Sequence, residues 1–286
     1  MRLTARVPAT SANLGPGFDC LALALDLVNE VVIDTGDPAG VTWEGEGAAE
    51  LPTDGGDMVS HAMRWTAEAA GRELPPVAMH GLNRIPLERG LGSSAAACVA
   101  GIVLADRVLG LGMASDDVLR VAVDLEGHPD NAAAAIHGGL AIVVDAPRRV
   151  VRLDAHPDLR PVVLIPPERL ATADARAALP AEVPFGDAVF NAGRAALAVV
   201  ALTRRPELLS VALEDRLHQD RRLRMVPSVM DAFGRYVSAD VPICVSGAGP
   251  TLLAFDVGSN VVVAPDDSWL VLRPGVRSSG AEIVEA

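Results

Sequence analysis

The chain is poor in aromatic residues and in positive charge. Aromatics make up 3% of its 286 residues, and the formal net charge is −13. A negative protein repels the phosphate backbone of nucleic acids, and few aromatic side chains leave little surface for stacking bases. These deficits argue against a nucleic-acid-binding role and against a general attraction to anionic membranes. An anionic ligand would need local backbone N–H groups, a few arginines and a cation.

Cysteine is scarce, and long apolar runs are absent. Cys20, Cys98 and Cys244 are odd in number and widely spaced, which indicates neither a disulfide framework nor a zinc site. No apolar run approaches a membrane-spanning length, and the first residues lack the apolar core of a signal peptide. We therefore expect a cytoplasmic protein whose three thiols are reduced and buried as small hydrophobic side chains.

Apolar residues, by contrast, are plentiful. They make up 50% of the chain, against 21% charged residues, which is enough to build large cores. The length exceeds that of one ordinary domain, so we expect two. The pattern restarts after Pro147, which predicts one unit over residues 1–147 and a second over residues 148–286. Strands and helices follow in mixed order, which predicts an α+β fold.

Local patterns predict the individual elements. Strands are expected at residues 3–7, 23–33, 41–43, 77–82, 140–144, 150–153, 162–165, 243–246, 251–255, 269–272 and 282–284. Helices are expected at residues 58–70, 95–109, 173–178, 189–202, 208–213 and 229–236, with a short one from residue 131. A further helix is expected to end at Glu126 with Ser115 as its N-cap, and Asn29 with Glu30 is expected to break the second strand.

The most informative segment is the glycine-rich stretch 86–97, with sequence PLERGLGSSAAA. Gly90 and Gly92 allow positive φ angles and a close backbone approach, and they lead into a helix whose first N–H groups favour anions. The stretch is neither a Walker loop nor a dinucleotide fingerprint. On composition alone, a plain glycine loop with Ser93 as helix N-cap explains it equally well.

Two more segments give this stretch a context. They are VPATSANLGPGFDCL at residues 7–21 and ICVSGAGPT at residues 243–251. In this order, the three segments resemble the motifs of the GHMP kinases, and the wording of the first is closest to the homoserine kinases. The resemblance covers essentially the whole chain. It implies two lobes with the active site between them, an N-terminal lobe like domain 2 of ribosomal protein S5 and a ferredoxin-like C-terminal lobe.

The resemblance implies ATP as the phosphoryl donor, bound by the glycine-rich stretch. The implied contacts are Pro86, Leu87, Gly90, Leu91, Gly92, Ser93, Ser94, Ala95 and Ala96. It also implies Mg²⁺ held by the hydroxyl of Ser94 and the carboxylate of Glu126. A carboxylate at a helix C-terminus opposes the macrodipole, so Glu126 benefits from a nearby cation. Glu88, inside the stretch, is expected to point away from the phosphates.

The resemblance further implies L-homoserine as the substrate and O-phospho-L-homoserine, used in threonine synthesis, as the product. The implied substrate contacts are Asn13, Asp19, His128, Asn131, Arg176 and Arg222. An aspartate after a Gly-Pro-Gly turn suits an ammonium group, and two guanidinium forks suit a carboxylate. The expected catalytic set is Asn13, Asp19, Ser94, Glu126 and Arg222. No general base is identified, and positioning alone is expected to suffice.

Simpler explanations stay open for single residues. The side chains of Asn13 and Asp19 can hydrogen-bond to the backbone of their own turn. A lone arginine is usually a surface residue, and the other five histidines have no second ligand at metal-binding spacing. Another GHMP kinase, acting on a mevalonate-type or sugar-like alcohol, would share the ATP loop. A non-catalytic binding module would be expected to lack Ser94 or Glu126. The resemblance also implies a homodimer. At residue 57, near the expected adenine site, this chain has Asp where members of the family often have Asn.

Overall fold

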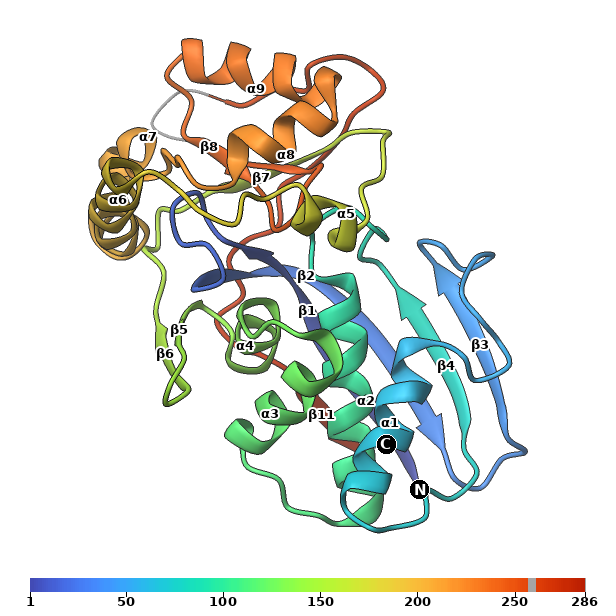
Figure 1. Ribbon diagram of the computed structural model, residues 1–286. Coiled ribbons are helices and arrows are strands. Elements are labelled where there is room, and N and C mark those ends of the chain that lie inside the picture. Colours follow the sequence, from blue (N-terminus) through green and yellow to red (C-terminus); the bar gives the residue numbers. More distant parts are fainter. Residues whose placement is uncertain (257–260, 286) are drawn as a thin grey trace.

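The computed structural model describes residues 1–256 and 261–285 and shows an α+β protein of two lobes (Figure 1). The larger lobe is built on a seven-stranded sheet whose main path runs β11-β1-β2-β4-β3, with β5 paired to β2 and to β6. All its pairs are antiparallel except β3 with β4. Its strands are β1 (Arg2–Ala12), β2 (Leu21–Asp34), β3 (Gly40–Gly45), β4 (Ala78–Asn83), β5 (Leu140–Val144), β6 (Arg149–Leu153) and β11 (Glu282–Glu285).

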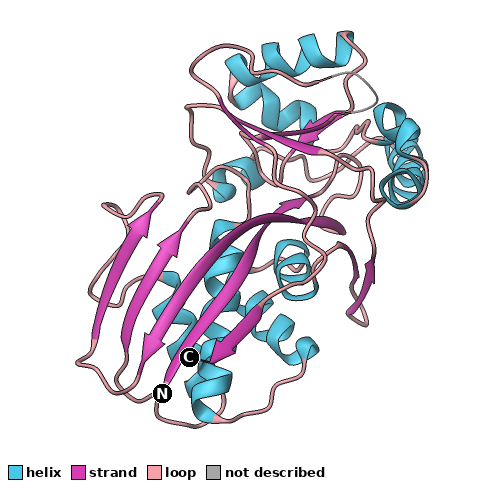
Figure 2. Cartoon of the chain, turned by 180° about the vertical axis from the view of Figure 1, so that it is seen from behind, coloured by secondary structure: helices cyan, strands magenta, loops and turns pink. Residues whose placement is uncertain are grey.

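Helices cover one face of this sheet (Figure 2). They are α1 (Met58–Ala69), α2 (Ser93–Leu109), α3 (Ser115–Glu126) and α4 (Asp130–His137). The central helix is α2, an Ala-, Val- and Leu-rich segment that ends at Gly110 in the left-handed conformation. A Cβ atom at Gly101 would overlap the carbonyl oxygen of Val59, so glycine lets α1 and α2 approach closely.

The smaller lobe contains a four-stranded antiparallel sheet in the order β10-β7-β9-β8. Its strands are β7 (Pro161–Ile165), β8 (Ile243–Val245), β9 (Leu252–Phe255) and β10 (Leu270–Leu272). Its helices are α5 (Thr172–Ala177), α6 (Phe185–Thr203), the 3₁₀ turn η1 (Pro206–Leu208), α7 (Leu209–Ala212), α8 (Gln219–Met225) and α9 (Pro227–Ser238). Alternate side chains of β7 and β9 lie in different cores. Val163, Leu253 and Phe255 belong to the large core that also contains the β1 and β2 side chains, so the lobes share apolar packing.

Most expected elements are found, with three corrections. The strand β2 runs through Asn29 and Glu30, because β1 pairs with both residues and β4 pairs with Glu30, while Arg84 and Arg6 neutralise the Glu30 carboxylate. The N-cap of α3 is Ala114, and Ser115 is the first helical residue. The helix α8 was not expected, because its DRRLR core has no apolar period.

The strand pairing bears on the expected junction at residue 147. The strands β5 and β6 lie on either side of that residue and form one hairpin of the larger sheet. The last strand, β11, returns to pair with β1. We therefore propose that the larger lobe includes residues 149–153 and 282–285 besides residues 1–147, and that the smaller lobe is an insertion between β6 and β11.

Candidate active site

A cavity of about 420 Å³ lies between the lobes and is lined from both of them. It collects all the predicted site residues except Leu87 and Ala96, which line an adjoining cavity of about 350 Å³. The residues in the first cavity are Asn13, Asp19, Pro86, Gly90, Leu91, Gly92, Ser93, Ser94, Ala95, Glu126, His128, Asn131, Arg176 and Arg222. Glu88 is exposed and lines both cavities. Five segments that lie far apart in the sequence therefore meet at one place.

The turn before α2 is shaped by its two glycines. Gly90 and Gly92 have φ angles of 72° and 67°, which favour glycine. A Cβ at Gly92 would overlap Oγ1 of Thr10, and one at Gly90 would overlap the carbonyl oxygen of Ser246. Gly92 is the N-cap of α2 and offers no side-chain acceptor. The first N–H groups of α2 are therefore free to bind an anion.

Ser94 and Glu126 form a hydroxyl–carboxylate pair beside this turn, with the Ser94 hydroxyl donating to Oε1 of Glu126. Burial raises the pKa of Glu126, and the Ser94 hydrogen bond opposes that shift. A hydroxyl and a carboxylate oxygen are the hard ligands that Mg²⁺ prefers. The described residues contain no group of three or more His, Cys, Asp and Glu side chains at metal-binding spacing. An ion here would therefore take most of its ligands from phosphate oxygens and water, as Mg²⁺ usually does.

The turn between β1 and β2 carries Asn13 and Asp19, both at positive φ. Nδ2 of Asn13 donates to the Gly247 carbonyl at 2.8 Å, and its Oδ1 accepts from the Asp19 N–H at 3.0 Å. The Asn13 side chain thus hydrogen-bonds within its own turn. One N–H of its Nδ2 and one lone pair of its Oδ1 are left for a ligand. The Asp19 carboxylate instead faces Arg176, whose two terminal nitrogens each donate to it at 2.9 Å.

Arg222 is buried at the wall of the same cavity, with 4% of its surface exposed. Its Nη1 donates to the Gly247 carbonyl at 2.7 Å, and its Nε is buried without a hydrogen-bond partner among the described residues. Burial, aided by nearby Arg176, lowers the pKa of Arg222 to about 10. The guanidinium carbons of Arg176 and Arg222 lie 5.6 and 5.3 Å from the centre of the Phe18 ring. Two cations on one ring make a local positive field in an acidic protein.

His218 was not predicted to take part, yet it supports this cluster. Its Nδ1 accepts from Nη1 of Arg222 at 3.1 Å, so its Nε2 carries the proton and donates to the Gly15 carbonyl at 2.7 Å. Burial lowers the pKa of His218, and the neighbouring Asp215 opposes that shift. The available sequence signal was its position four residues before Arg222, one helical turn away.

Asp130 is a second residue that the sequence did not single out. Its Oδ1 accepts from the N–H of Asn131 at 2.8 Å and lies 3.4 Å from Nδ1 of His128. This carboxylate raises the pKa of His128. The amide Oδ1 of Asn131 accepts from the Thr10 hydroxyl at 2.8 Å. Asp130 thus lies against His128, which precedes α4, while Thr10 holds the side chain of Asn131.

The adjoining cavity has mostly apolar walls, including Trp43, Met58 and Leu87. Such walls suit a flat base next to the turn at residues 88–92, the predicted phosphate-binding turn. The buried Asp57, which departs from the family pattern, accepts from the Ser60 N–H at 2.9 Å and caps α1. The other carboxylate oxygen of Asp57 is buried, and no residue in the described ranges donates to it.

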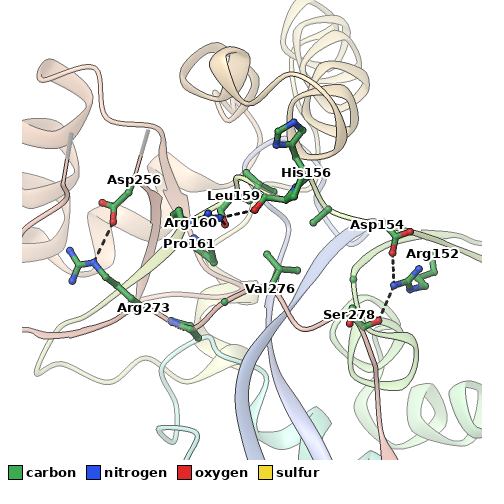
Figure 3. Close-up of a pocket in the computed structure, with 15 residues that line it drawn as sticks. Arg152, Asp154, His156, Leu159, Arg160, Pro161, Asp256, Arg273, Val276 and Ser278 are labelled. Carbon is green, nitrogen blue, oxygen red and sulfur yellow. Dashed lines mark hydrogen bonds and ion pairs between the residues drawn. The ribbon is translucent and has the colours of Figure 1, made fainter. Parts of the chain in front are cut away.

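Another hollow of about 460 Å³ lies near the other side of the lobe junction (Figure 3). Its arginines already form ion pairs or hydrogen bonds. Nη2 of Arg152 lies 2.7 Å from Oδ1 of Asp154, and Nε of Arg273 lies 3.3 Å from Oδ2 of Asp256. Arg160 donates to a main-chain carbonyl at 2.7 Å. No predicted site residue lines this hollow, so the candidate active site is the cavity at the phosphate-binding turn.

The chain is similar to proteins of one known family. The family model for the GHMP kinases N terminal domain matches residues 57–139, which include the phosphate-binding turn and Glu126. The homoserine kinase of Rhodococcus erythropolis is 45% identical over 100% of this chain and 93% of its own, and that of Streptomyces coelicolor is 42% identical over 98% and 93%. The crystal structure of homoserine kinase from Cytophaga hutchinsonii superposes with a TM-score of 0.83 at 26% identity, covering 99% of this chain and 97% of that one.

Proposed function

The chain belongs to the homoserine kinases of the GHMP family, and from this we propose that it transfers the γ-phosphoryl group of ATP to the side-chain hydroxyl of L-homoserine. The product is O-phospho-L-homoserine, an intermediate for threonine synthesis. The observation that carries the proposal is that one cavity contains both the phosphate-binding turn and a charged cluster of Asp19, Arg176 and Arg222. The turn suits a triphosphate, and the cluster suits an amino acid.

We assign the phosphate-binding role to the backbone N–H groups from Gly90 to Ala95. They lie at the N-terminus of α2, where the helix dipole also favours negative charge. A magnesium ion held by Ser94 and Glu126 would neutralise charge on the phosphate oxygens. Phosphoryl transfer passes through a loose transition state, so positioning and charge neutralisation suffice. This explains why a general base is not required of the side chains in the cavity.

The amino acid is assigned to the other end of the cavity. Asp19 binds its ammonium group, and Arg176 with Arg222 binds its carboxylate. Asn13, His128 and Asn131 line the space between these groups and the phosphate-binding turn, where the hydroxyl would lie. A mevalonate-type alcohol lacks the ammonium group and a sugar-like alcohol lacks both charged groups, so neither would pair with both Asp19 and the arginines, which disfavours these substrates.

A turnover assay tests the proposal. Purified protein is incubated with ATP, Mg²⁺ and single alcohols, and ADP release is measured for L-homoserine, L-serine, L-threonine, mevalonate and galactose. We expect homoserine-dependent release that stops when the metal is chelated and resumes when Mg²⁺ is restored. Turnover with mevalonate or galactose instead would identify another kinase of the family. A lack of turnover with every alcohol would favour a binding module.

We also retain the homodimer as a proposal and assign its contact to α6. This helix is long and apolar enough, by length and composition alone, to match a membrane span, but it carries Asp187 and Arg194. Phe185 and Val189 are 85% and 56% exposed on one face, and such a face is typical of a protein contact. Light scattering on Val189→Asp tests this, because the variant should be monomeric if α6 forms the contact. A cytoplasmic location stays a prediction.

A further inference from the structure

The ion pair between Asp19 and Arg176 has an unusual place, because it lies inside the site proposed for the amino acid. Nη1 and Nη2 of Arg176 donate to Oδ2 and Oδ1 of Asp19, both at 2.9 Å, in a parallel two-bond arrangement. The side chains are 42% and 34% exposed, and both line the cavity. The two residues proposed to hold the opposite ends of the amino acid therefore hold each other.

The two partners are not equally free to move. Asp19 sits at a φ of 52° in the β1–β2 turn, and its N–H is bonded to Asn13. Arg176 belongs to α5, a helix of six residues, and among the described residues its guanidinium donates hydrogen bonds only to Asp19, besides its contact with the Phe18 ring. Separation of the pair therefore requires only that the long arginine side chain swing away. In the part of the chain that the structure describes, the buried Nε of the nearby Arg222 has no acceptor, so it can donate to a ligand.

We propose that the Asp19–Arg176 pair makes this enzyme select zwitterions, because the amino acid binds by exchanging ion pairs with it. The ammonium group of the ligand replaces Arg176 at Asp19, and its carboxylate replaces Asp19 at Arg176. Every charge stays paired when both ligand groups are present. A ligand with one charged group breaks the internal pair and satisfies only one of its members. This inference rests on the proposed function and adds a reason for its specificity.

The exchange predicts that removing Asp19 increases the affinity for a ligand without an ammonium group. A simple loss of contacts would not increase it. The test ligand is 4-hydroxybutanoate, which keeps the hydroxyl and carboxylate of homoserine but lacks the ammonium. In Asp19→Asn, Arg176 no longer has an internal partner, so 4-hydroxybutanoate should bind about two- to fivefold more tightly than to the wild type, the upper part of the range for a partly exposed ion pair. Binding of L-homoserine should weaken in the same variant. Both are measured by isothermal titration calorimetry.

The mirror experiment uses Arg176→Gln and 3-aminopropan-1-ol, which keeps the hydroxyl and the amine but lacks the carboxylate. Asp19 is then without its internal partner, and the amine should bind more tightly than to the wild type. Asp174→Asn is the matched control, because it removes an exposed acid of the same helix that does not line the cavity. It should leave the affinity for both analogues within about twofold of the wild type.

A double variant separates exchange from plain charge repulsion. If Asp19 merely repels the carboxylate of 4-hydroxybutanoate, the Asp19→Asn change should tighten its binding in an Arg176→Gln background as well. Exchange predicts no gain there, because the gain needs Arg176. A gain in the double variant, or no gain in Asp19→Asn, overturns the exchange. Should one variant fail to fold, the other arm decides, since each predicts its own gain.

The outcome also distinguishes the exchange from the function on which it rests. If the wild type releases ADP with L-homoserine but neither analogue gains affinity, the kinase function stands and the exchange is wrong. If the wild type releases no ADP with L-homoserine, the proposed function fails first.

Discussion

The carbonyl group of Gly247 joins the two lobes at the level of single residues. It accepts one hydrogen bond from Asn13 in the larger lobe and one from Arg222 in the smaller lobe. A carbonyl oxygen has two lone pairs, so both are used. Ser246, next to it, donates to the Gly90 carbonyl at 2.7 Å. The third sequence motif therefore positions the residues of the other two.

Substitution of Glu126 and of Arg222 should change different kinetic constants. Glu126→Ala removes a proposed stabiliser of charge that develops in the reaction, so kcat should fall by about 100-fold or more. Arg222→Ala removes a proposed charged contact to the substrate carboxylate, so the KM for homoserine should rise by about tenfold or more. Steady-state kinetics with each substrate varied in turn separates the two effects.

Exposed neighbours supply the controls for this pair. Asp124→Ala on α3 and Arg221→Ala on α8 change the same charges at exposed positions. Both should keep wild-type kinetics within about twofold. Unchanged kinetics in Glu126→Ala and Arg222→Ala would remove the site assignment.

His218 gives a pH dependence whose sign follows from burial. Its pKa is lowered in the folded protein from an ordinary value of 6.5. Below that pH the imidazole therefore binds a proton in the unfolded chain more readily than in the folded chain. Stability should therefore fall as the pH drops below about 6.5. His218→Gln keeps a donor for Gly15 and removes this titration, so its urea midpoint should fall less between about pH 7.5 and about pH 5.5 than that of the wild type. An equal fall in both proteins would refute this account.

At the scale of elements, the phosphate-binding turn is held by its close neighbours. Thr10 of β1 donates its N–H to the Leu91 carbonyl at 3.0 Å, and Leu170 donates to the Glu88 carbonyl at 3.2 Å. The two lobes thus support the same turn from opposite sides. Its shape depends on contacts with β1 and with the loop before α5, and not on local propensity alone.

Gly92→Ala should therefore impair the turn more than a glycine change elsewhere on α2. A methyl group at Gly92 would overlap Thr10, while Gly110, at the other end of α2, has a similar φ of 62° and open space around it. Gly110→Ala is thus a matched control for the backbone cost alone, about 1 kcal/mol. We expect Gly92→Ala to lower the free energy of unfolding further and to raise the KM for ATP. Equal effects of both changes would contradict the steric argument.

At the scale of the whole molecule, the sequence predicted the α+β class, most elements and the residues that meet in one cavity. Long apolar helices such as α2 and alternating strands carry their own signal. The sequence did not predict α8, where Arg222 is buried by tertiary contacts that no local pattern encodes. Nor did it predict that β6 and β11 join the larger sheet, because strand pairing across long separations is not a local property. The roles of His218 and Asp130 depend on the same long-range contacts.

The shared core predicts how the molecule unfolds. Apolar side chains of β7 and β9 pack in the same cluster as those of β1 and β2, and the chain returns to the larger sheet at β11. The lobes should therefore unfold together, in one calorimetric transition whose van't Hoff and calorimetric enthalpies agree. Two transitions that separate on heating would show that the lobes are independent.

The central claim is that the turn before α2 binds the triphosphate together with a metal ion. The most direct test is a crystal structure with a non-hydrolysable ATP analogue, Mg²⁺ and L-homoserine. We predict phosphate oxygens on the N–H groups of residues 90–95 and the metal between Ser94 and Glu126. A triphosphate bound elsewhere, with this turn unoccupied, would contradict the account.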